Sequence, residues 1–380
     1  MDRPVRLMQS MVHRAPAESS ICATWVEVME ITEKATNTEH ERVLVAHDAA
    51  TGYRGIIAIH SSVLGPAIGG TRLWNYASEA EALTDALRLS RGMTYKNALP
   101  GLPLGGGKAV IIGDGKTLNR ETIFRAHGRF VETLGGRFIT AEDVGTGPAD
   151  MEIVRRETSH VGGLLSGAGD PSPFTARGVF RAMQAAASYV WNGGDLSRVT
   201  VAIQGCGNVG YHLAKSLNAV GAKLIVSDVD ARKVSRVVEE FNANAVRPEE
   251  IFSVRADIFA PCALGGVIND QTIPKLTARI VAGAANNQLL EERHGEMLKE
   301  RGILYVPDYA ANAGGVFSGC IDLLGWDRER AWNKVDEIYD TIWNIFEIAK
   351  TQGISTNKAA DMLAEKRLEN AATSRTSVAI

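Results

Sequence analysis

Two lysines stand twelve positions apart in a stretch, residues 91–109, that carries almost no other charge. Lys96 follows a helical pattern that opens with the capping box Ser78-Glu-Ala-Glu81, so we expect it at or just past a helix C-terminus. Lys108 comes after three glycines and before Ala109-Val-Ile-Ile112, a run typical of a buried strand. Glycines lack a Cβ and let the backbone come close to a ligand, so the pattern predicts a lysine presented for catalysis.

Two other interpretations of Lys108 need weighing. A phosphate-binding loop, G-x-x-x-x-G-K-[ST], requires a glycine where the chain has Leu102 and a hydroxyl where it has Ala109, so that motif does not fit. A lysine at a strand end can also simply extend its ammonium group into solvent. That structural interpretation stays open on this stretch alone.

An acid follows the predicted strand Arg137-Phe-Ile-Thr-Ala141. Asp143 lies there in the glycine-containing segment Glu142-Asp-Val-Gly-Thr-Gly147. As a structural residue it would cap the following turn, and as a functional residue it would share a cleft with the lysines. Both interpretations remain open.

A second glycine cluster has the form of a dinucleotide-binding motif. The β-branched run Val199–Gln204 precedes Gly205-Cys-Gly207-Asn-Val-Gly210, and a helical pattern of apolar residues follows. The first glycine permits the tight turn, the second lets a pyrophosphate approach the backbone, and the third lets the helix pack on the strand. Strand, glycines and helix stand in the order that this motif requires.

The acids that follow the next strand favour NAD over NADP. Asp228 ends the run Lys223-Leu-Ile-Val-Ser-Asp228 and can accept hydrogen bonds from the adenosine ribose. Together with Asp230 it would repel a 2′-phosphate. The predicted cofactor is therefore NAD.

Composition and charge exclude several classes of protein. Apolar residues make up 45% and charged residues 22% of the 380 residues, as in a globular protein long enough for two domains. The net charge of −3 gives no reason to expect binding to nucleic acid or to an acidic membrane, and no apolar run is long enough to cross a bilayer. Residues 1–18 lack the apolar core of a secretory signal, so we expect a mobile extension there.

Cysteine and histidine usage predicts neither disulfides nor a metal. The cysteines Cys22, Cys206, Cys262 and Cys320 are scattered without a C-x-x-C pair, which fits a reducing cytoplasm. No histidine pair has metal-ligand spacing, and His60 and His127 lie within apolar patterns typical of packed side chains. The absence of a G-x-S-x-G motif argues against the commonest hydrolase class.

The elements around these residues predict an α/β protein with two domains. We expect an N-terminal α/β substrate domain and a C-terminal Rossmann-type, doubly wound parallel sheet, separated by a catalytic cleft. The predicted ranges are 1–168, 169–345, and a C-terminal helical segment 346–380 that returns to the first domain. The predicted strands are 42–46, 55–59, 109–112, 137–141, 199–204, 223–228, 257–260, 280–282 and 303–306. Residues 65–72 are predicted as a glycine-rich loop, Asn119 and Thr175 as helix caps, and 328–350 as one long helix.

With both glycine clusters in view, the chain resembles the glutamate/leucine/phenylalanine/valine dehydrogenase family, most strongly its valine and leucine dehydrogenases. The resemblance runs from about Val43 to Arg367. The motifs that carry it, in order, are Gly65-Pro-Ala-Ile-Gly-Gly-Thr-Arg72, Gly92-Met-Thr-Tyr-Lys96, Gly105-Gly-Gly-Lys-Ala109, Ala141-Glu-Asp-Val-Gly-Thr146, Ala260-Pro-Cys-Ala-Leu-Gly265, Gly283-Ala-Ala-Asn-Asn-Gln288 and Asn312-Ala-Gly-Gly315.

The resemblance implies reversible oxidative deamination of an L-α-amino acid to a 2-oxo acid and ammonia, with NAD as hydride acceptor. It assigns Lys96 to the substrate carboxylate, Lys108 to catalysis with a lowered pKa, and Asp143 to proton exchange with the amino group. A second nearby ammonium group in a desolvated cleft would push the pKa of Lys108 down, toward the range in which acid–base catalysis is efficient.

The resemblance also implies the remaining site residues. Gly69 and Gly70 would shape the substrate loop, Ala310 would line the side-chain pocket, and Asn287 would lie beside both the cofactor ribose and the substrate. The expected cofactor-binding residues are Thr175, Gly205, Gly207, Asn208, Val209, Gly210, Asp228, Cys262, Ala263 and Asn287.

The preferred substrate is a branched aliphatic L-amino acid, with an aromatic one as the alternative. The motifs Tyr76-Ala-Ser-Glu-Ala-Glu81 and Lys108-Ala-Val-Ile-Ile-Gly-Asp114 favour the aliphatic class. Ala310 and Ala311 stand where relatives often have Val or Ile, which would leave room for a ring. No residue is evident for a glutamate carboxylate, whose unpaired burial would be costly.

Two other functions are considered. A non-catalytic NAD-binding protein would have no need of Lys96, Lys108 and Asp143, all of which are present. A hydroxy-acid dehydrogenase would be expected to use a histidine, and none lies in these motifs. The family resemblance also implies a homo-oligomer, as does an edge that we expect in the strands between Arg42 and Ile59.

Overall fold

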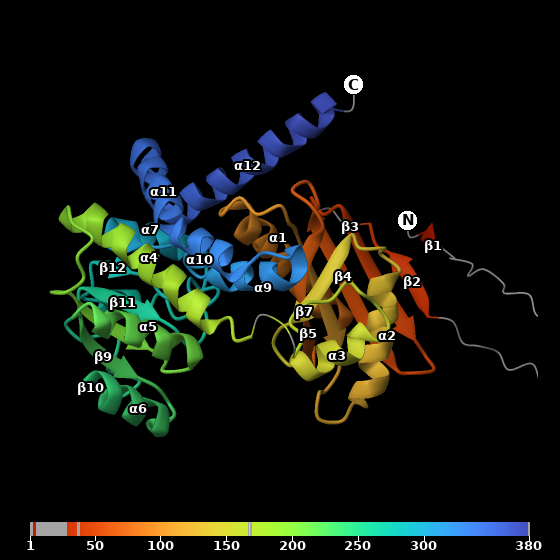
Figure 1. The fold of residues 1–380 in the computed structure, drawn as a ribbon, viewed down its shortest axis with the longest axis horizontal. Helices are drawn as coiled ribbons and strands as arrows, with labels where there is room; N and C mark the ends of the chain where they lie inside the picture. Colours follow the sequence, from red (N-terminus) through yellow and green to blue (C-terminus); the bar gives the residue numbers. More distant parts are fainter. Residues whose placement is uncertain (1–2, 5–28, 36–38, 166, 168, 379–380) are drawn as a thin grey trace, which may run out of the picture. The chain divides into compact units, whose positions relative to one another are not determined.

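The computed structural model (Figure 1) describes residues 3–4, 29–35, 39–165, 167 and 169–378. The chain forms two compact units. The first comprises residues 1–94 and 103–165, and the second comprises residues 95–102 and 166–380. The predicted extension, residues 1–18, lies outside the described residues except for Arg3–Pro4.

The C-terminal segment groups with the second unit, which also includes residues 95–102. Two hydrogen bonds join residues 95–102 to helix α12 (Thr356–Val378). Tyr95 donates from its hydroxyl to Glu365 Oε1 at 2.7 Å, and Arg367 donates to the carbonyl of Ala98 at 3.0 Å. The predicted domain ranges, 1–168, 169–345 and 346–380, remain a prediction.

The first unit is built on a mixed sheet with the strand order β1-β2-β3-β4-β6-β5-β7. Strands β3 and β4 form an antiparallel hairpin, and β5 runs parallel to both of its neighbours. The strands are β1 (Arg3–Pro4), β2 (Glu30–Glu33), β3 (Arg42–Asp48), β4 (Tyr53–Ser61), β5 (Ala67–Trp74), β6 (Gly105–Ile112) and β7 (Phe138–Glu142).

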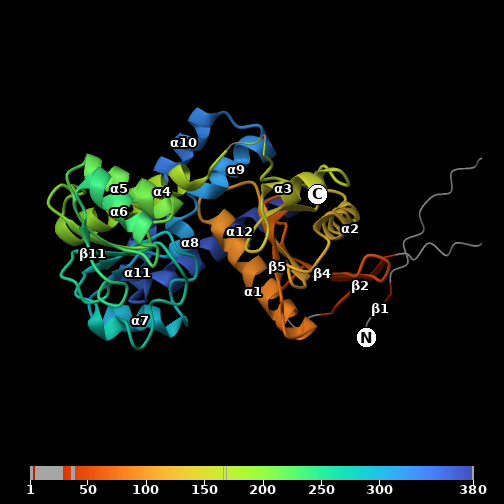
Figure 2. The same ribbon diagram turned by 90° about the horizontal axis from the view of Figure 1, so that it is seen from below.

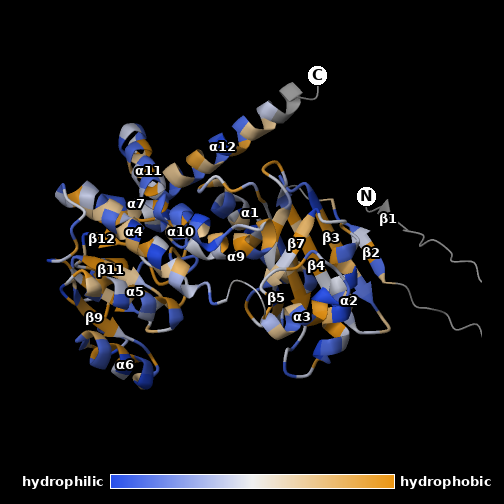
Figure 3. Cartoon of the chain, viewed as in Figure 1, coloured by the Kyte–Doolittle hydropathy of each residue, from blue (hydrophilic) through white to orange (hydrophobic). Residues whose placement is uncertain are grey.

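Helices cover both faces of this sheet (Figure 2) because successive strand residues alternate between two apolar surfaces. On one face, Ile56 and Ala58 pack with Ala82 and Ala86 of helix α1 (Glu79–Ala98). The opposite face packs against α2 (Arg120–Glu132) and α3 (Pro148–Arg155). Figure 3 shows the apolar residues gathered on the strands and the polar ones on the outer helix surfaces.

Two predictions for this unit are corrected. Residues 67–72 of the predicted glycine-rich loop belong to strand β5 (Ala67–Trp74), because Gly69 and Gly70 serve close strand packing instead of a turn. Strands β3 and β4 do not form an edge, since β3 pairs with β2 and β4 pairs with β6. The predicted cap is confirmed: Asn119 accepts a hydrogen bond from the backbone of Thr122 at the start of α2.

The second unit contains a parallel sheet with the order β10-β9-β8-β11-β12-β13. Numbered by chain order, this is the 3-2-1-4-5-6 arrangement of a Rossmann fold, so the predicted fold class is confirmed. The strands are β8 (Thr200–Gln204), β9 (Lys223–Ser227), β10 (Asn244–Ala245), β11 (Ile258–Pro261), β12 (Ile280–Val281) and β13 (Leu304–Tyr305). The direction of the order reverses between β8 and β11, where this fold binds its ligands.

Helices flank these strands. Helix α5 (Asn208–Ala219) follows β8, and α6 (Ala231–Phe241) follows β9. The helices that come later are η1 (Ile273–Lys275), α7 (Arg293–Glu300), α8 (Asp308–Ala311), α9 (Gly314–Leu324), α10 (Arg328–Asp336), α11 (Ile338–Gln352) and α12 (Thr356–Val378). Among the described residues, no helix is both long and apolar enough to span a bilayer.

Two helix predictions in this unit are wrong. Helix α4 (Ser172–Trp191) begins before Thr175, so Thr175 lies inside its first turn and donates its hydroxyl to the carbonyl of Pro171 at 3.1 Å. The predicted helix 328–350 is two helices, α10 and α11, which meet at Glu337.

Candidate active site

Lys108 and Asp143 come together in the first unit. Strands β6 and β7 flank β5, where Thr71 pairs with Ala109 on one side and with Glu142 on the other. The residues next to these partners, Lys108 and Asp143, therefore lie at the same level of the sheet. The Lys108 ammonium donates to Asp143 Oδ2 at 2.6 Å.

This pair is buried and charged. Lys108 is only 5% exposed, so the interpretation that it extends into solvent does not hold. Burial lowers the pKa of Lys108, against the attraction of Asp143, and the Arg72 guanidinium lowers it further. Burial raises the pKa of Asp143, but Lys108 and Arg72 outweigh it and hold that pKa below its usual value. The ammonium therefore loses its proton more readily than an ordinary lysine.

The carboxylate of Asp143 is turned toward cations and does not cap the following turn. That turn is held by Thr146, whose Oγ1 accepts the backbone N–H of Asp143 at 2.8 Å. Arg72 donates through Nε to Asp143 Oδ2 at 3.0 Å. Both cations therefore meet on one carboxylate oxygen.

Glycine is required at Gly69 and Gly70 because the strands approach closely. A Cβ at Gly69 would lie 1.8 Å from the carbonyl oxygen of Gly107. A Cβ at Gly70 would lie 2.4 Å from the Glu142 carbonyl oxygen and 2.8 Å from Asp143 Cβ. The two glycines thus let β5 fit between β6, which carries Lys108, and β7, which leads into Asp143.

Sequence reasoning missed two charged residues of this site. Arg72 pairs through its terminal nitrogen with Asp85 Oδ2 at 2.9 Å as well as with Asp143. Asp85 lies on α1 beside the buried Ala82 and Ala86. The sequence offered one signal for each residue. Asp85 is an acid at the border of the apolar stripe of α1, and Arg72 is a lone arginine after the glycines of β5.

The nucleotide-binding motif has the predicted geometry in the second unit. The three glycines connect β8 to α5, with Asn208 and Val209 as the first helical residues. Gly205 has a φ of 106°, which only glycine adopts readily. A Cβ at Gly210 would lie 2.0 Å from the Gly205 carbonyl oxygen, so the third glycine packs helix on strand.

Gly207 differs because a Cβ there would meet no heavy atom within 4 Å. The open space lies at the N-cap of α5, whose backbone N–H groups attract anions. Packing therefore does not require this glycine, whereas a pyrophosphate close to the backbone would. The residues present fit a dinucleotide.

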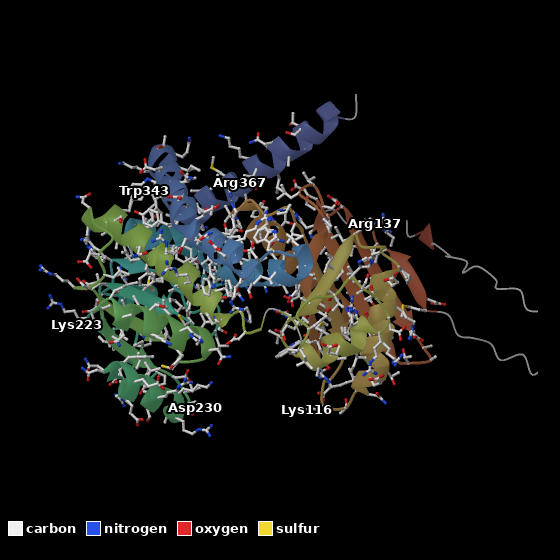
Figure 4. The ribbon with its side chains drawn as sticks, viewed as in Figure 1. Lys116, Arg137, Lys223, Asp230, Trp343 and Arg367 are labelled. Atoms are coloured by element: carbon white, nitrogen blue, oxygen red, sulfur yellow. The ribbon has the colours of Figure 1, made fainter. Side chains whose placement is uncertain are left out.

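Asp228 closes the nucleotide motif on the β9 side. Its Oδ2 accepts the backbone N–H of Cys206 at 2.7 Å, and its Oδ1 accepts that of Asp230 at 2.9 Å. Asp230 itself caps α6 by accepting from the backbone of Arg232, and Figure 4 labels it on this unit. Asp228 thus links the loops after β8 and β9 at the edge where a ribose is expected.

Residues from later strands surround the same loop. A Cβ at Gly205 would lie 2.9 Å from the backbone nitrogen of Ala263, and the backbone N–H of Cys262 donates to the Gln204 carbonyl at 2.7 Å. Asn287 has the left-handed φ of 52°, and its carbonyl accepts from Gly266 at 2.7 Å. Thr175 lies beside Gly315, where a Cβ would come within 2.8 Å of Oγ1.

Lys96 lies in the last turn of α1, as predicted, in the part of that helix that groups with the second unit. Its charge reaches Asp308, a buried carboxylate whose pKa burial raises and Lys96 lowers. Asp308 accepts from the Tyr305 hydroxyl at 3.1 Å and from the backbone of Gln288 at 3.4 Å. Ala310, on α8, is 1% exposed.

One group of metal-capable side chains occurs among the described residues, namely Asp270, Glu291 and His294. The guanidinium of Arg293 already pairs with Asp270 at 2.5 Å and with Glu291 at 2.8 Å. The charge of these carboxylates is thereby compensated without an ion. The expectation of no metal remains a prediction.

A Rossmann sheet with the G-x-G-x-x-G motif, together with a buried lysine–aspartate pair, is typical of a dinucleotide-dependent oxidoreductase. The family models agree: "Glu/Leu/Phe/Val dehydrogenase, dimerisation domain" matches residues 40–160, and "Glutamate/Leucine/Phenylalanine/Valine dehydrogenase" matches residues 167–232 and 226–376. The chain belongs to this family, as its sequence motifs predicted. It is an amino-acid dehydrogenase that uses a nicotinamide cofactor.

Individual relatives are similar to this chain over nearly its whole length. A leucine dehydrogenase of Geobacillus stearothermophilus is 54% identical over 90% of this chain and 94% of its own length. A valine dehydrogenase of Streptomyces coelicolor is 48% identical over 87% and 93%, respectively. The crystal structure of an L-tryptophan dehydrogenase from Nostoc punctiforme has a TM-score of 0.80 and 48% identity, covering 88% of this chain and 97% of its own.

Proposed function

We propose that the protein catalyses the NAD-dependent, reversible oxidative deamination of a branched-chain aliphatic L-amino acid to its 2-oxo acid and ammonia. The observation that carries the chemistry is the buried contact of 2.6 Å between Lys108 and Asp143. The aliphatic substrate class is supported by the leucine dehydrogenases that are 50–54% identical to this chain.

The reaction sets three tasks for the side chains. Lys96 binds the substrate carboxylate, and Asp143 accepts a proton from the substrate ammonium so that the nitrogen lone pair can assist the reaction. A nicotinamide cofactor held at the glycine motif would supply the acceptor for the hydride that Cα loses. Lys108, in its neutral form, then takes a proton from the water that attacks the resulting iminium carbon. Asp143 then returns its proton to the amino nitrogen of the adduct. As the C–N bond breaks, its electron pair leaves with the nitrogen and the hydroxyl proton of the adduct passes to the Asp143 carboxylate, so that ammonia and the 2-oxo acid are released.

The preference for NAD over NADP is part of the proposal. It is supported by Asp228, whose carboxylate at the end of β9 would repel a 2′-phosphate. The neighbouring Val229 is 92% exposed and brings no cation to this edge. A second carboxylate, Asp230, adds to the negative charge.

An aromatic L-amino acid is the second candidate substrate. It is supported by Ala310 and Ala311, both at most 1% exposed, which are smaller than the Val or Ile expected there. Pocket methyl groups discriminate by only about 1–3 kcal/mol each, so two such positions suffice to change the preferred substrate. The 48% identity to an L-tryptophan dehydrogenase points in the same direction.

Self-association and location complete the proposal. The name of the family model for residues 40–160, a dimerisation domain, supports a homo-oligomer. The unpaired thiols of Cys206, Cys262 and Cys320 suit a reducing cytoplasm. We propose no nucleic-acid or membrane partner.

The test is a panel of kcat/KM values for L-Val, L-Leu, L-Ile, L-Phe, L-Trp and L-Glu, each with NAD and with NADP, followed at 340 nm. We expect an aliphatic substrate with NAD to lead. Aromatic substrates ahead by tenfold or more would replace the aliphatic assignment by the second candidate, and NADP ahead of NAD would overturn the role given to Asp228. No turnover of any amino acid would leave a non-catalytic NAD-binding protein.

A further inference from the structure

We infer that Arg72 and Asp85 act as positioning residues for catalysis: together they hold Asp143 against Lys108 and set the pH range in which that pair works. This inference rests on the proposed function, in which Lys108 must be neutral to activate water. It concerns two residues outside the pair itself, and it follows from a chain of ionic contacts within the first unit.

The contacts form a continuous path from the catalytic pair to α1. Asp143 Oδ2 receives both Lys108 Nζ, at 2.6 Å, and Arg72 Nε, at 3.0 Å. The other end of the same guanidinium donates to Asp85 Oδ2 at 2.9 Å. Arg72 therefore bridges two carboxylates, and its position is fixed from both sides.

Asp85 is itself held in place by further donors. Tyr76 donates its hydroxyl to Asp85 Oδ2 at 2.7 Å, and Arg88 donates to Oδ1 at 3.1 Å. The side chains of Arg72 and Asp85 are only 20% and 16% exposed, whereas that of Arg88 is 64% exposed. The charges of Arg72 and Asp85 are thus poorly screened by water, and that of Arg88 is well screened.

These groups surround Lys108 from the elements that pack against β6. Strand β4 places the uncharged Ala58 opposite it, β5 supplies Arg72, the segment after β7 supplies Asp143, and α1 supplies Asp85. Burial is the main cause that lowers the pKa of Lys108, Asp143 and Asp85 oppose it, and Arg72 adds to it. The two positioning residues therefore act on Lys108 with opposite signs.

Because Arg72 and Asp85 act on the pKa of Lys108 in opposite directions, replacing each should shift the pH dependence in opposite directions. A purely structural role would not produce such opposite shifts. Asp85→Asn removes a negative charge but keeps the shape, so protonated Lys108 is stabilised less and the acid limb of kcat/KM against pH moves to lower pH. Arg72→Gln removes a positive charge, so the acid limb moves to higher pH. At a fixed pH on that limb, normalised to each variant's plateau, we expect changes of about twofold to fivefold in opposite directions.

Matched controls lie on the same helix. Glu81→Gln removes an exposed carboxylate one turn before Asp85 and should keep the wild-type profile. Asp85→Glu, which restores the charge, should return the acid limb toward its wild-type position. Shifts in the same direction for Asp85→Asn and Arg72→Gln, or no shift in either, would overturn the inference.

A second readout does not depend on turnover. The pH dependence of Lys108 acylation by trace acetic anhydride, measured by peptide mass spectrometry on the folded protein, follows the neutral amine directly. It should shift in the same two directions in variants whose thermal midpoints match the wild type. If these shifts occur but no amino acid is turned over, the proposed function fails, while the inference about Arg72 and Asp85 stands. If labelling of Lys108 does not shift in either variant, the inference about Arg72 and Asp85 is overturned.

Discussion

Lys108 combines deep burial with a charged partner at 2.6 Å, and the two act in opposite directions on its proton. A fully buried lysine without a charged partner would be neutral at neutral pH. A lysine in an exposed ion pair would stay protonated. The site lies between these limits because Asp143 is shared with Arg72. Sharing weakens the hold of the carboxylate on either cation.

At this scale we expect Lys108→Ala to lower kcat by about 10²–10⁴-fold, the range for loss of a general acid–base group, while NAD still binds. Lys96→Ala should instead mainly raise KM, because it removes the partner of the substrate carboxylate. Steady-state kinetics measure kcat and KM, and a fluorescence titration with NADH measures cofactor binding. Lys116→Ala, on an exposed turn of the same unit (Figure 4), serves as the control. Wild-type kcat in Lys108→Ala would refute its role.

The elements carry a second buried polar chain, which joins strands β4 and β5 to helix α2. His127 on α2 contacts the Tyr53 hydroxyl through Nδ1 and Thr71 Oγ1 through Nε2, each at 2.8 Å. Burial lowers the pKa of His127 to about 3. The ring is therefore neutral in the folded protein at any pH at which the enzyme is expected to work.

Acid should destabilise the protein through this ring. The unfolded chain protonates His127 below about pH 6.5, whereas the folded pKa is about 3, so acidification favours the unfolded state between these values. We expect one such histidine to contribute a slope of about 1.4 kcal/mol per pH unit, and His127→Gln to remove it. Urea unfolding from pH 7 to pH 4 measures the slope. A slope in His127→Gln equal to that of the wild type would contradict the assignment.

The elements also mark the limits of what could be predicted from the sequence. The glycine motif, its flanking strand and helix and the acid after β9 were predicted correctly, because each depends on residues that lie close together in the chain. The loop predicted for residues 65–72 is wrong from residue 67 on, because glycines such as Gly69 and Gly70 are also typical of turns. The close approach of β6 and β7, which requires glycine at both positions, is not visible in the local sequence. Asp85 meets Arg72 across 13 positions of sequence, and no local pattern predicts that contact.

At the scale of the whole molecule, the strand order in the sheet of the first unit bears on how two copies of the chain could associate. Strands β3 and β4 are interior, so the edge argument made from them fails. Within the part of the chain that the structure describes, β1 pairs with Thr32 and Glu33 of β2, and Glu30 and Ile31 have no strand partner on that side. A homo-oligomer is expected from the family and not from the position of β3 and β4.

Light scattering should therefore give a mass of at least twice the 40.8 kDa of one chain. We expect the value to be independent of concentration across the micromolar range, as for an obligate assembly. Dilution into 1 M salt is the control for weak electrostatic association, which salt would screen. A mass near 40.8 kDa under all conditions would remove the oligomer from the proposal.

Because of the open space beside Gly207, a side chain at this position would affect the stability of the fold and the binding of a cofactor in opposite directions. Its φ of −68° suits any residue, and a Cβ there meets nothing within 4 Å, so the fold tolerates a side chain at this N-cap. Ser or Asp in its place would even stabilise α5 by accepting from its first backbone N–H groups. The same side chain would fill the space in which we propose that the pyrophosphate binds. An engineering campaign that screened only for heat resistance would thus favour the substitution that most directly abolishes cofactor binding.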